Sequence, residues 1–417
     1  MADQIFLPYG KHRVTPEDIE AVVEVLQSDW LTQGPAVPAF EDALARELGA
    51  AEAVACSSGT AALHLAMLAL GLGEGDAVIT TPNSFVATAN CARYVGATVI
   101  FADIDPKTGL IDPTSIARLL SKDLDRTIKA IIPVHFAGQP ADLPAIYALA
   151  RRHGAWVVDD ASHALGATYE YNRQPYRLGG NPHSDLTIFS FHPVKHVAAG
   201  EGGAVVTDNA ELAERLRLFR SHGIIRRDFI NHDMAVSSDG VPNPWYYEMH
   251  DLGFNYRLTD LQAALGLSQL RRLQWSLQRR REIAHLYQRM IAETFDGGEA
   301  VPLELKSDAT HAYHLFVVQI DFDRLETTRA VVMNRLRAQG IGTQVHYIPI
   351  HLQPYYRGSA PSDGRPLDGA EEYYAHALSL PMYPDLEESD IKRVVGELAV
   401  ALEVKPAPAL VRQHNPV

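Results

Sequence analysis

The sequence predicts an α/β protein with a large domain built on a mostly parallel sheet, followed by a smaller α+β domain. Seven short apolar runs occur in the first half of the 417-residue chain, and helical patterns lie between them. Most of the runs are continuous rather than alternating, which is typical of strands that are buried on both faces. Because strands and helices alternate, we expect an open, wound sheet that is covered by helices.

The large domain is expected to span residues 1–262, including an N-terminal segment. Helical patterns such as Ala61–Leu70 and Leu143–His153 separate its strand candidates. In chain order, the strand candidates are Ala53–Cys56, Ala77–Thr80, Thr98–Ala102, Ala130–His135, Trp156–Asp159, Leu186–Ser190 and Ala204–Thr207.

A helical pattern rich in arginine begins at Thr259 and is expected to connect the large domain to the smaller one. Its apolar residues fall near one helical face: Leu270, Leu273, Leu277, Ala284, Tyr287 and Ile291. The smaller domain is placed at residues 263–404, with strands at Ala312–Ile320 and Thr343–Tyr347 and helices near Thr328–Gln339 and Glu388–Ala401. Asn231–Trp245 and Pro361–Gly369 are expected to be loops, and the Pro-rich tail 405–417 to be disordered.

The overall charge excludes several classes of partner. The formal net charge is −14 at pH 7, which argues against general affinity for nucleic acid or for anionic membranes. An anionic ligand therefore needs a local cluster of donors. Cys56 and Cys91 lie in apolar surroundings without metal-ligand spacing, and no signal-peptide pattern or membrane-spanning run is present. We expect a cytoplasmic enzyme without a metal site.

One lysine stands in a turn between two expected strands. Leu186–Ser190 is followed by Pro193, Lys195, the glycine-rich turn Gly200–Gly203 and then the next apolar run. An amine held above the edge of a sheet can react with an aldehyde, because burial lowers the pKa of lysine. The alternative interpretation is a surface lysine in an ordinary loop. The spacing of Gly200–Gly203 does not fit a dinucleotide-binding motif.

Further polar groups follow other strands at the edge where wound sheets bind ligands. Ser57-Ser58-Gly59-Thr60 opens a helix, so it either binds an anion through backbone N–H groups or simply caps the helix. Phe85 is either a core aromatic or a lid on a flat ring. Asp159 and Asp160 end a buried strand, where two carboxylates need a cationic partner unless they cap a helix.

Together these groups match one cofactor. Pyridoxal 5′-phosphate (PLP) has a phosphate, a flat ring, a ring nitrogen and an aldehyde. The predicted anion site, aromatic lid, carboxylate and amine correspond to these four parts in turn. PLP is therefore the cofactor that the sequence predicts.

Longer stretches carry a family resemblance. The chain resembles the DegT/DnrJ/EryC1/StrS family of PLP-dependent sugar aminotransferases, from about Leu31 to beyond Tyr383. The resemblance implies the aspartate aminotransferase-like fold (PLP fold type I) and a homodimer with shared active sites. It rests on the stretches 57–63, 81–90, 190–203 and 253–260.

The resemblance also implies roles for individual residues. Lys195 would bind the cofactor aldehyde covalently and move a proton during the reaction. The remaining cofactor contacts would be Gly59, Thr60 and Ser190 at the phosphate, Asp160 at the ring nitrogen, Phe85 and His163 at the ring, and Asn255 at the phosphate of the neighbouring subunit's cofactor. Asp159 stands where the family usually has glutamate, and it remains a lesser candidate for the ring nitrogen.

Within the family, the chain is most similar to the aminotransferases of pseudaminic acid biosynthesis. This similarity rests on 160–166, on 220–223 followed by Asp228-Phe229, and on 344–347 followed by Pro349-Ile350. It implies L-glutamate as amino donor and a UDP-linked 4-keto-6-deoxy-N-acetylhexosamine as acceptor. Arg226 and Arg227 would bind the diphosphate unless they are a solvated surface pair, and His346 and Tyr347 would line the sugar pocket.

The same fold supports other functions. A 3- or 4-ketosugar carried by another nucleotide, such as a dTDP-sugar, is the main alternative acceptor. A PLP-dependent sugar dehydratase would carry histidine in place of Lys195. A cysteine desulfurase would need a reactive cysteine on a mobile loop, and a non-catalytic regulator would not need Lys195, Asp160 and Ser190 together.

Overall fold

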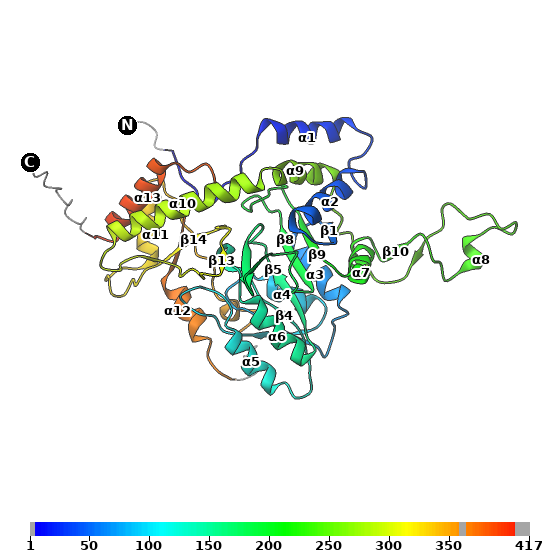
Figure 1. The fold of residues 1–417 in the computed structure, drawn as a ribbon, viewed down its shortest axis with the longest axis horizontal. Helices are drawn as coiled ribbons and strands as arrows, with labels where there is room; N and C mark the ends of the chain where they lie inside the picture. Colours follow the sequence, from blue (N-terminus) through cyan, green and yellow to red (C-terminus); the bar gives the residue numbers. More distant parts are fainter. Residues whose placement is uncertain (1–4, 358–363, 405–417) are drawn as a thin grey trace, which may run out of the picture.

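The core of the molecule is a seven-stranded sheet, seen in the centre of Figure 1. The computed structural model describes residues 5–357 and 364–404. The strand order is β1-β9-β8-β5-β4-β2-β3. The strands are β1 (Glu52–Cys56), β2 (Ala77–Thr80), β3 (Thr98–Phe101), β4 (Ile128–Ile132), β5 (Trp156–Asp160), β8 (Leu186–Ser190) and β9 (Gly203–Thr207).

Six of these strands are parallel, and only β9 runs in the opposite direction between β1 and β8. Every residue of β2 and β9 is buried, as expected for strands covered on both faces. The prediction of a mostly parallel α/β sheet is confirmed. Each of the seven strand candidates overlaps an observed strand, and the ends of the two differ by at most three residues.

Helices connect these strands and cover the sheet. Helices α3 and α7 pack together and contact β1 and β9, α6 contacts β5, and α5 packs on α6. Helices α1 and α2 both pack against α9. The helices in this part of the chain are α1 (Pro16–Gln27), α2 (Ala36–Leu48), α3 (Gly59–Ala69), α4 (Ala87–Tyr94), α5 (Pro113–Lys122), α6 (Leu143–His153), α7 (Ala210–Arg220) and α9 (Asp260–Leu270), with a 3-10 turn at Phe136–Gly138.

The C-terminal part has its own hydrophobic cluster around the long helix α10 (Leu273–Thr294). Its three-stranded sheet has the order β12-β14-β15 and is antiparallel. The elements are β12 (Val301–Pro302), β14 (Phe316–Gln319), α11 (Arg329–Ala338), a 3-10 turn at Ile350–Leu352, α12 (Asp368–His376), β15 (Ala377–Leu380) and α13 (Glu388–Ala401). A third sheet joins β13 (Ala309–Thr310) to the hairpin of β6 (Thr168–Tyr171) and β7 (Gln174–Arg177).

The structure departs from the sequence predictions in two places here. The single helix expected from Thr259 is two helices, because the helix ends at Leu270 and a new one begins at Leu273. Thr343–Tyr347 is not a strand and makes only an isolated bridge from Gln344 to Ser379. The division at residues 262/263 stays a prediction, and the tail 405–417 lies outside the described residues, as does part of Pro361–Gly369.

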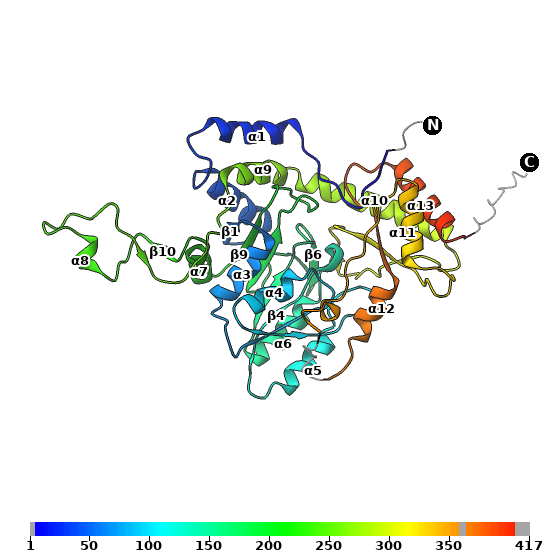
Figure 2. The same cartoon turned by 180° about the vertical axis from the view of Figure 1, so that it is seen from behind.

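An arm projects from the body beside α7, on the side away from α10 and α13 (Figures 1 and 2). It comprises β10 (Ile224–Ile225), the short helix α8 (His232–Ala235) and β11 (Glu248–Met249), which pairs with β10. The segment Asn231–Trp245 was expected to be a loop, and α8 is its only helix in the part of the chain described.

The carboxylate of Glu248 holds the arm together. It accepts hydrogen bonds from the backbone N–H groups of Ile230 (2.8 Å) and Asn231 (2.7 Å), from the Tyr246 hydroxyl (2.9 Å) and from His250 Nε2 (2.7 Å). Burial favours the neutral acid, but these hydrogen bonds outweigh it and lower the pKa of Glu248 to about 2.

None of the helices built from the described residues combines the length and apolar character that a membrane crossing requires. The cytoplasmic location stays a prediction.

Replacing Glu248 with alanine should loosen the arm without unfolding the sheet. Its four donors lose their acceptor, so amide hydrogen exchange between residues 226 and 250 should accelerate on the order of tenfold. Mass-spectrometric exchange at pH 7 measures this directly. In the unmodified protein the protection should be complete above the ordinary glutamate pKa of 4.5 and should weaken as the pH falls toward 2.

The matched control is Glu214→Ala. Glu214 forms an exposed ion pair with Arg227, and such pairs contribute little. Equal acceleration in both variants, or no acceleration in Glu248→Ala, would contradict the role given to Glu248.

Candidate active site

A cavity of about 640 Å³ opens at the carboxyl edge of the large sheet. The loops that follow β1, β2, β5 and β8 form one part of its wall, and residues 344–348 of the C-terminal part form another. Nine of the residues predicted for the site lie on its wall: Gly59, Thr60, Phe85, Asp160, His163, Ser190, Lys195, His346 and Tyr347.

The N-terminus of α3 forms an anion cradle in this cavity. Ser58 caps the helix, with its hydroxyl accepting from the Ala61 N–H at 3.1 Å, and Gly59 and Thr60 are the first two helical residues. The first N–H groups of a helix have no partner inside it and attract anions. A Cβ on Gly59 would lie 3.0 Å from the Cβ of Ser190, so the missing side chain lets the helix end approach Ser190.

Asp160 presents its carboxylate to the cavity. Its Oδ2 accepts from the Thr88 hydroxyl at 2.8 Å, and its Oδ1 accepts from the Ser162 N–H at 3.1 Å. The Ser84 hydroxyl lies 2.8 Å from that of Thr88. Because Thr88 donates its proton to Asp160, Ser84 must donate to Thr88. Each carboxylate oxygen keeps a lone pair for a further donor in the cavity.

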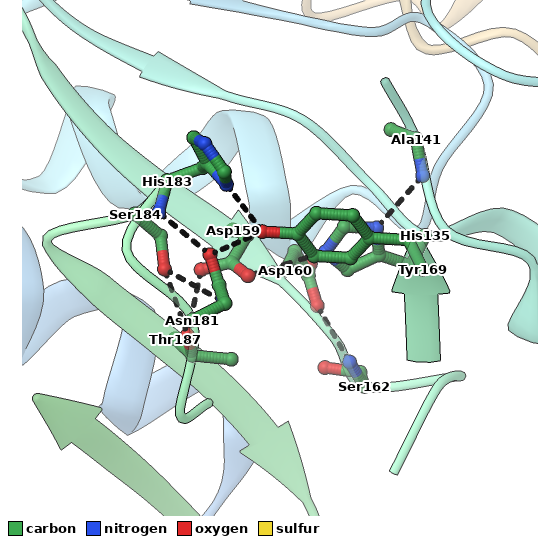
Figure 3. A network of polar contacts seen from close by, with 10 residues as sticks. All are labelled: His135, Ala141, Asp159, Asp160, Ser162, Tyr169, Asn181, His183, Ser184 and Thr187. Carbon is green, nitrogen blue, oxygen red and sulfur yellow. Dashed lines mark hydrogen bonds and ion pairs between the residues drawn. The ribbon is translucent and has the colours of Figure 1, made fainter. Parts of the chain in front are cut away.

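Asp159 lies on the opposite face of β5 (Figure 3). It accepts from the Thr187 hydroxyl at 2.8 Å and contacts His135 Nε2 at 3.3 Å. The backbone N–H of Ala141 donates to His135 Nδ1, so the proton of a neutral His135 is on Nε2 and points at Asp159. Asp159 therefore has partners outside the cavity, and the geometry favours Asp160 as the carboxylate for a cofactor ring nitrogen.

Lys195 lies on the turn between β8 and β9, where its N–H donates to the carbonyl of His192 at 2.8 Å. Its side chain is partly buried and lines the cavity. Its amine makes no hydrogen bond or ion pair with any residue in 5–357 or 364–404. Burial lowers the pKa of Lys195 to about 8, although the charge of Asp160 opposes this shift. A large fraction of the amine is therefore neutral near pH 8.

Buried histidines surround the lysine. His163 Nε2 lies 3.1 Å from the Tyr347 hydroxyl, and His346 Nδ1 lies 2.9 Å from the Ser379 hydroxyl. The ring of His314 lies 4.4 Å from that of His163. Burial, reinforced by the nearby Lys195, lowers the pKa of His163 and His314 well below the usual value and that of His346 to about 3. All three are neutral at physiological pH.

The structure does not bring three predicted residues into this cavity. Asn255 is exposed at an isolated bridge with Ser221. Arg226 lies over the ring of Tyr247 at 5.9 Å, and Arg227 pairs with Glu214 at 2.9 Å on the exposed base of the arm. Their roles stay predictions that need a second subunit.

Several wall residues were missed from the sequence. Ser84 and Thr88 lie inside a stretch already recognised as important, and their position after β2 was the available signal. His314 stood inside a predicted strand, and Tyr9 lies far from every motif.

The chain is similar to known proteins over almost its whole length. The model of the DegT/DnrJ/EryC1/StrS aminotransferase family matches residues 12–399. The chain belongs to that family. The spore coat polysaccharide biosynthesis protein SpsC of Bacillus subtilis is 41% identical over 391 residues, which cover 94% of this chain and 95% of SpsC.

Two solved structures extend the likeness. Helicobacter pylori PseC, described as an aminotransferase involved in the biosynthesis of pseudoaminic acid, superposes with a TM-score of 0.82 at 33% identity, covering 95% of this chain and 99% of PseC. DesV of S. venezuelae superposes with a TM-score of 0.80 at 32% identity, covering 93% and 94%. The predicted family and fold are confirmed.

The family assignment makes the chain a PLP-dependent aminotransferase. The residues of the cavity fit this cofactor: the cradle at Gly59 and Thr60 with Ser190 suits a phosphate, Asp160 has a free lone pair for a ring nitrogen, and the amine of Lys195 is unpartnered. When bound, PLP supplies an electron sink for the substrate's reacting carbon. The dehydratase and regulator alternatives lose their support, since this chain keeps lysine at position 195.

The neutral amine of Lys195 should govern how fast the cofactor-free enzyme captures PLP. Only the unprotonated amine reacts with an aldehyde, so the capture rate should rise with pH and be half-maximal near pH 8. Stopped-flow absorbance across pH 6–10 measures this rate. Asp160→Asn removes the charge that raises the lysine pKa, so its midpoint should move to lower pH.

Lys195→Ala is the control and should give no covalent capture and no activity. A midpoint near the ordinary lysine value of 10.5, or an upward shift in Asp160→Asn, would contradict this account.

Proposed function

We propose that the enzyme moves the amino group of L-glutamate onto carbon 4 of a UDP-linked 4-keto-6-deoxy-N-acetylhexosamine of the pseudaminic acid type. The observation that carries the catalytic part is the amine of Lys195, which has no partner among the described residues and lines the same cavity as Asp160 and the anion cradle of α3. The choice of acceptor is supported by the likeness to PseC and by the motifs at 160–166 and 344–347.

Both substrates would react in the same cavity, one after the other. Lys195 would take a proton from the α-carbon of glutamate and later deliver one to carbon 4 of the sugar. Its lowered pKa suits both directions, because the amine is neutral in part and protonated in part near pH 8. Asp160 would hold the ring nitrogen and the α3 cradle the phosphate throughout. Ping-pong kinetics follow from one site serving two half-reactions.

The anionic groups of the substrates need more positive charge than the described residues on the cavity wall supply. The described residues on the cavity wall include Lys195 and four neutral or exposed histidines but no arginine. Two carboxylates, Asp160 and Glu201, also face it. A diphosphate would therefore need cationic groups from elsewhere, which supports a site completed by a second copy of the chain.

The arm is suited to this task. It projects from the body beside α7 (Figures 1 and 2). It carries Arg226 and Arg227 near its base and exposes a set of apolar side chains that a partner could cover. These exposed apolar residues are Ile230, Met234, Val241, Trp245, Tyr247, Met249 and Leu252. We propose a homodimer in which the arm and Asn255 reach the partner's active site.

A second candidate acceptor is a 3- or 4-ketosugar carried by another nucleotide, such as a dTDP-sugar. DesV superposes nearly as well as PseC, so the likeness in fold does not by itself select one acceptor.

The substrate is tested with purified, PLP-loaded enzyme, L-glutamate and a panel of UDP- and dTDP-linked 3-keto and 4-keto sugars. Mass spectrometry and NMR identify the aminated product. We expect the UDP-linked 4-keto-6-deoxy-N-acetylhexosamine to give the highest kcat/KM. Preference for a 3-keto or dTDP-linked sugar would overturn the acceptor while leaving the sugar aminotransferase intact.

Neutralising the arm arginines should affect one half-reaction only. In Arg226→Gln/Arg227→Gln the acceptor KM should rise roughly 10- to 100-fold, since charge-assisted hydrogen bonds to the diphosphate are lost. The glutamate half-reaction, followed by absorbance, should be nearly unchanged. Arg152→Gln, an exposed arginine on α6, is the control.

Mixing subunits tests whether the arginines act in the partner's site. When this double variant is mixed with Lys195→Ala subunits, heterodimers should regain one complete site and activity at low acceptor concentration. No gain despite confirmed subunit exchange, or equal loss in the glutamate half-reaction, would show that the arginines do not act across the interface.

A further inference from the structure

Residues 5–10 form an N-terminal strap that is fixed to the C-terminal part of the molecule. The N–H of Leu7 donates to the carbonyl of Gly340 at 2.8 Å, and the N–H of Gly342 donates to the carbonyl of Leu7 at 2.7 Å. The N–H of Met382 donates to the carbonyl of Tyr9 at 2.9 Å. The Leu7 side chain is buried in the C-terminal hydrophobic cluster. Backbone hydrogen bonds and the buried Leu7 side chain therefore fix the position of the strap.

The far end of the strap reaches the active-site cavity. Gly10 lies against Val194, the residue before Lys195, and Tyr9 lines the cavity. The ring of Tyr9 lies 5.3 Å from that of His346. The N-terminal strap thus places an aromatic side chain on the wall of the cavity that holds the reacting amine.

The hydroxyl of Tyr9 has no hydrogen-bond partner among the residues that the structure describes. Burial raises the pKa of Tyr9 above its usual value, so the hydroxyl stays protonated and can donate. A half-buried phenol without a partner at a cavity wall is a group that a ligand can satisfy.

The surroundings of Tyr9 match a sugar. Its neighbour His346 packs against Tyr347 with ring centroids 5.0 Å apart, and both residues were predicted to line the sugar pocket. This wall offers aromatic surface with a few polar groups, and a pyranose ring offers apolar C–H faces edged with polar substituents. Glutamate has no such ring.

We propose that Tyr9 contacts the sugar of the acceptor and determines how tightly the acceptor binds. Its ring would pack on the C–H face of the sugar and its hydroxyl would donate to a polar substituent. This inference rests on the proposed function only in taking the acceptor to be a nucleotide-linked sugar. Tyr9 takes no part in the glutamate half-reaction.

Two variants separate the two contacts of Tyr9. Tyr9→Phe keeps the packing and should raise the acceptor KM about threefold, as expected for one neutral hydrogen bond. Tyr9→Ala also removes the ring and should raise it on the order of tenfold or more. The glutamate half-reaction, followed by absorbance, should change less than about twofold in both, within the range of context effects.

A binding measurement without turnover gives the decisive comparison. Calorimetry with UDP-N-acetylglucosamine and with UDP should show weaker binding of the nucleotide sugar to Tyr9→Ala but unchanged binding of UDP. Phe6→Ala is the matched control, because Phe6 is an aromatic residue of the same strap that is 49% exposed and lies outside the cavity wall.

Each other outcome contradicts the inference in a recognisable way. Equal loss of UDP binding would place Tyr9 at the nucleotide, and equal loss in the glutamate half-reaction would make it a support for Lys195. Unchanged acceptor KM in both variants would remove it from the site. If the substrate panel selects a different nucleotide sugar, the proposed acceptor fails, and the selected nucleotide sugar and its nucleotide replace the two probes.

Discussion

The close approach of the α3 N-terminus to the ends of β8 and β9 is the constraint on which the rest of the site depends. It requires two glycines. A Cβ on Gly203 would lie 2.3 Å from the carbonyl oxygen of Ser58, and a Cβ on Gly59 would lie 3.0 Å from the Cβ of Ser190. Because neither position carries a Cβ, three groups meet at one edge of the sheet. They are the positive N-terminal end of α3, the hydroxyl of Ser190 and the turn that carries Lys195. Any side chain here would push the anion cradle away from the amine.

The two adjacent aspartates show how a strand separates two tasks. Successive side chains of β5 point to opposite faces, so Asp160 faces the cavity while Asp159 faces the interior. Asp159 and its partners Thr187 and His135 tie β5 to β8 and to the loop after β4, which keeps the strand end rigid (Figure 3). Asp160 is held by only two donors and remains available. At the same sheet edge, Asp159 thus stabilises the fold, while Asp160 can bind a ligand in the cavity.

Much of this arrangement could be predicted from the sequence, for physical reasons. The strands were found because a strand buried on both faces is a continuous apolar run. Asp160 directly follows the predicted run Trp156–Asp159, and Lys195 stands in the turn after Leu186–Ser190, so both could be placed at the sheet edge. The break between α9 and α10 could not be predicted, because the apolar residues continue at helical spacing across it. Tyr9 and His314 were missed because their place in the cavity depends on contacts between segments far apart in the chain. The roles predicted for Arg226 and Arg227 rest on the proposed second subunit, which a single sequence does not describe.

The N-terminal strap bears on how the protein is made. Leu7 and Tyr9 are synthesised long before Gly340, Gly342 and Met382, whose backbone groups hold them. The large sheet ends at Thr207, so it can assemble while translation continues, as N-terminal units generally do. The cavity wall at Tyr9 cannot form until Met382 has been made. A translation product that stops before Gly340 would therefore hold the reactive lysine in an unfinished pocket, and a chain without residues 5–10 would fold around the same lysine and lack one wall.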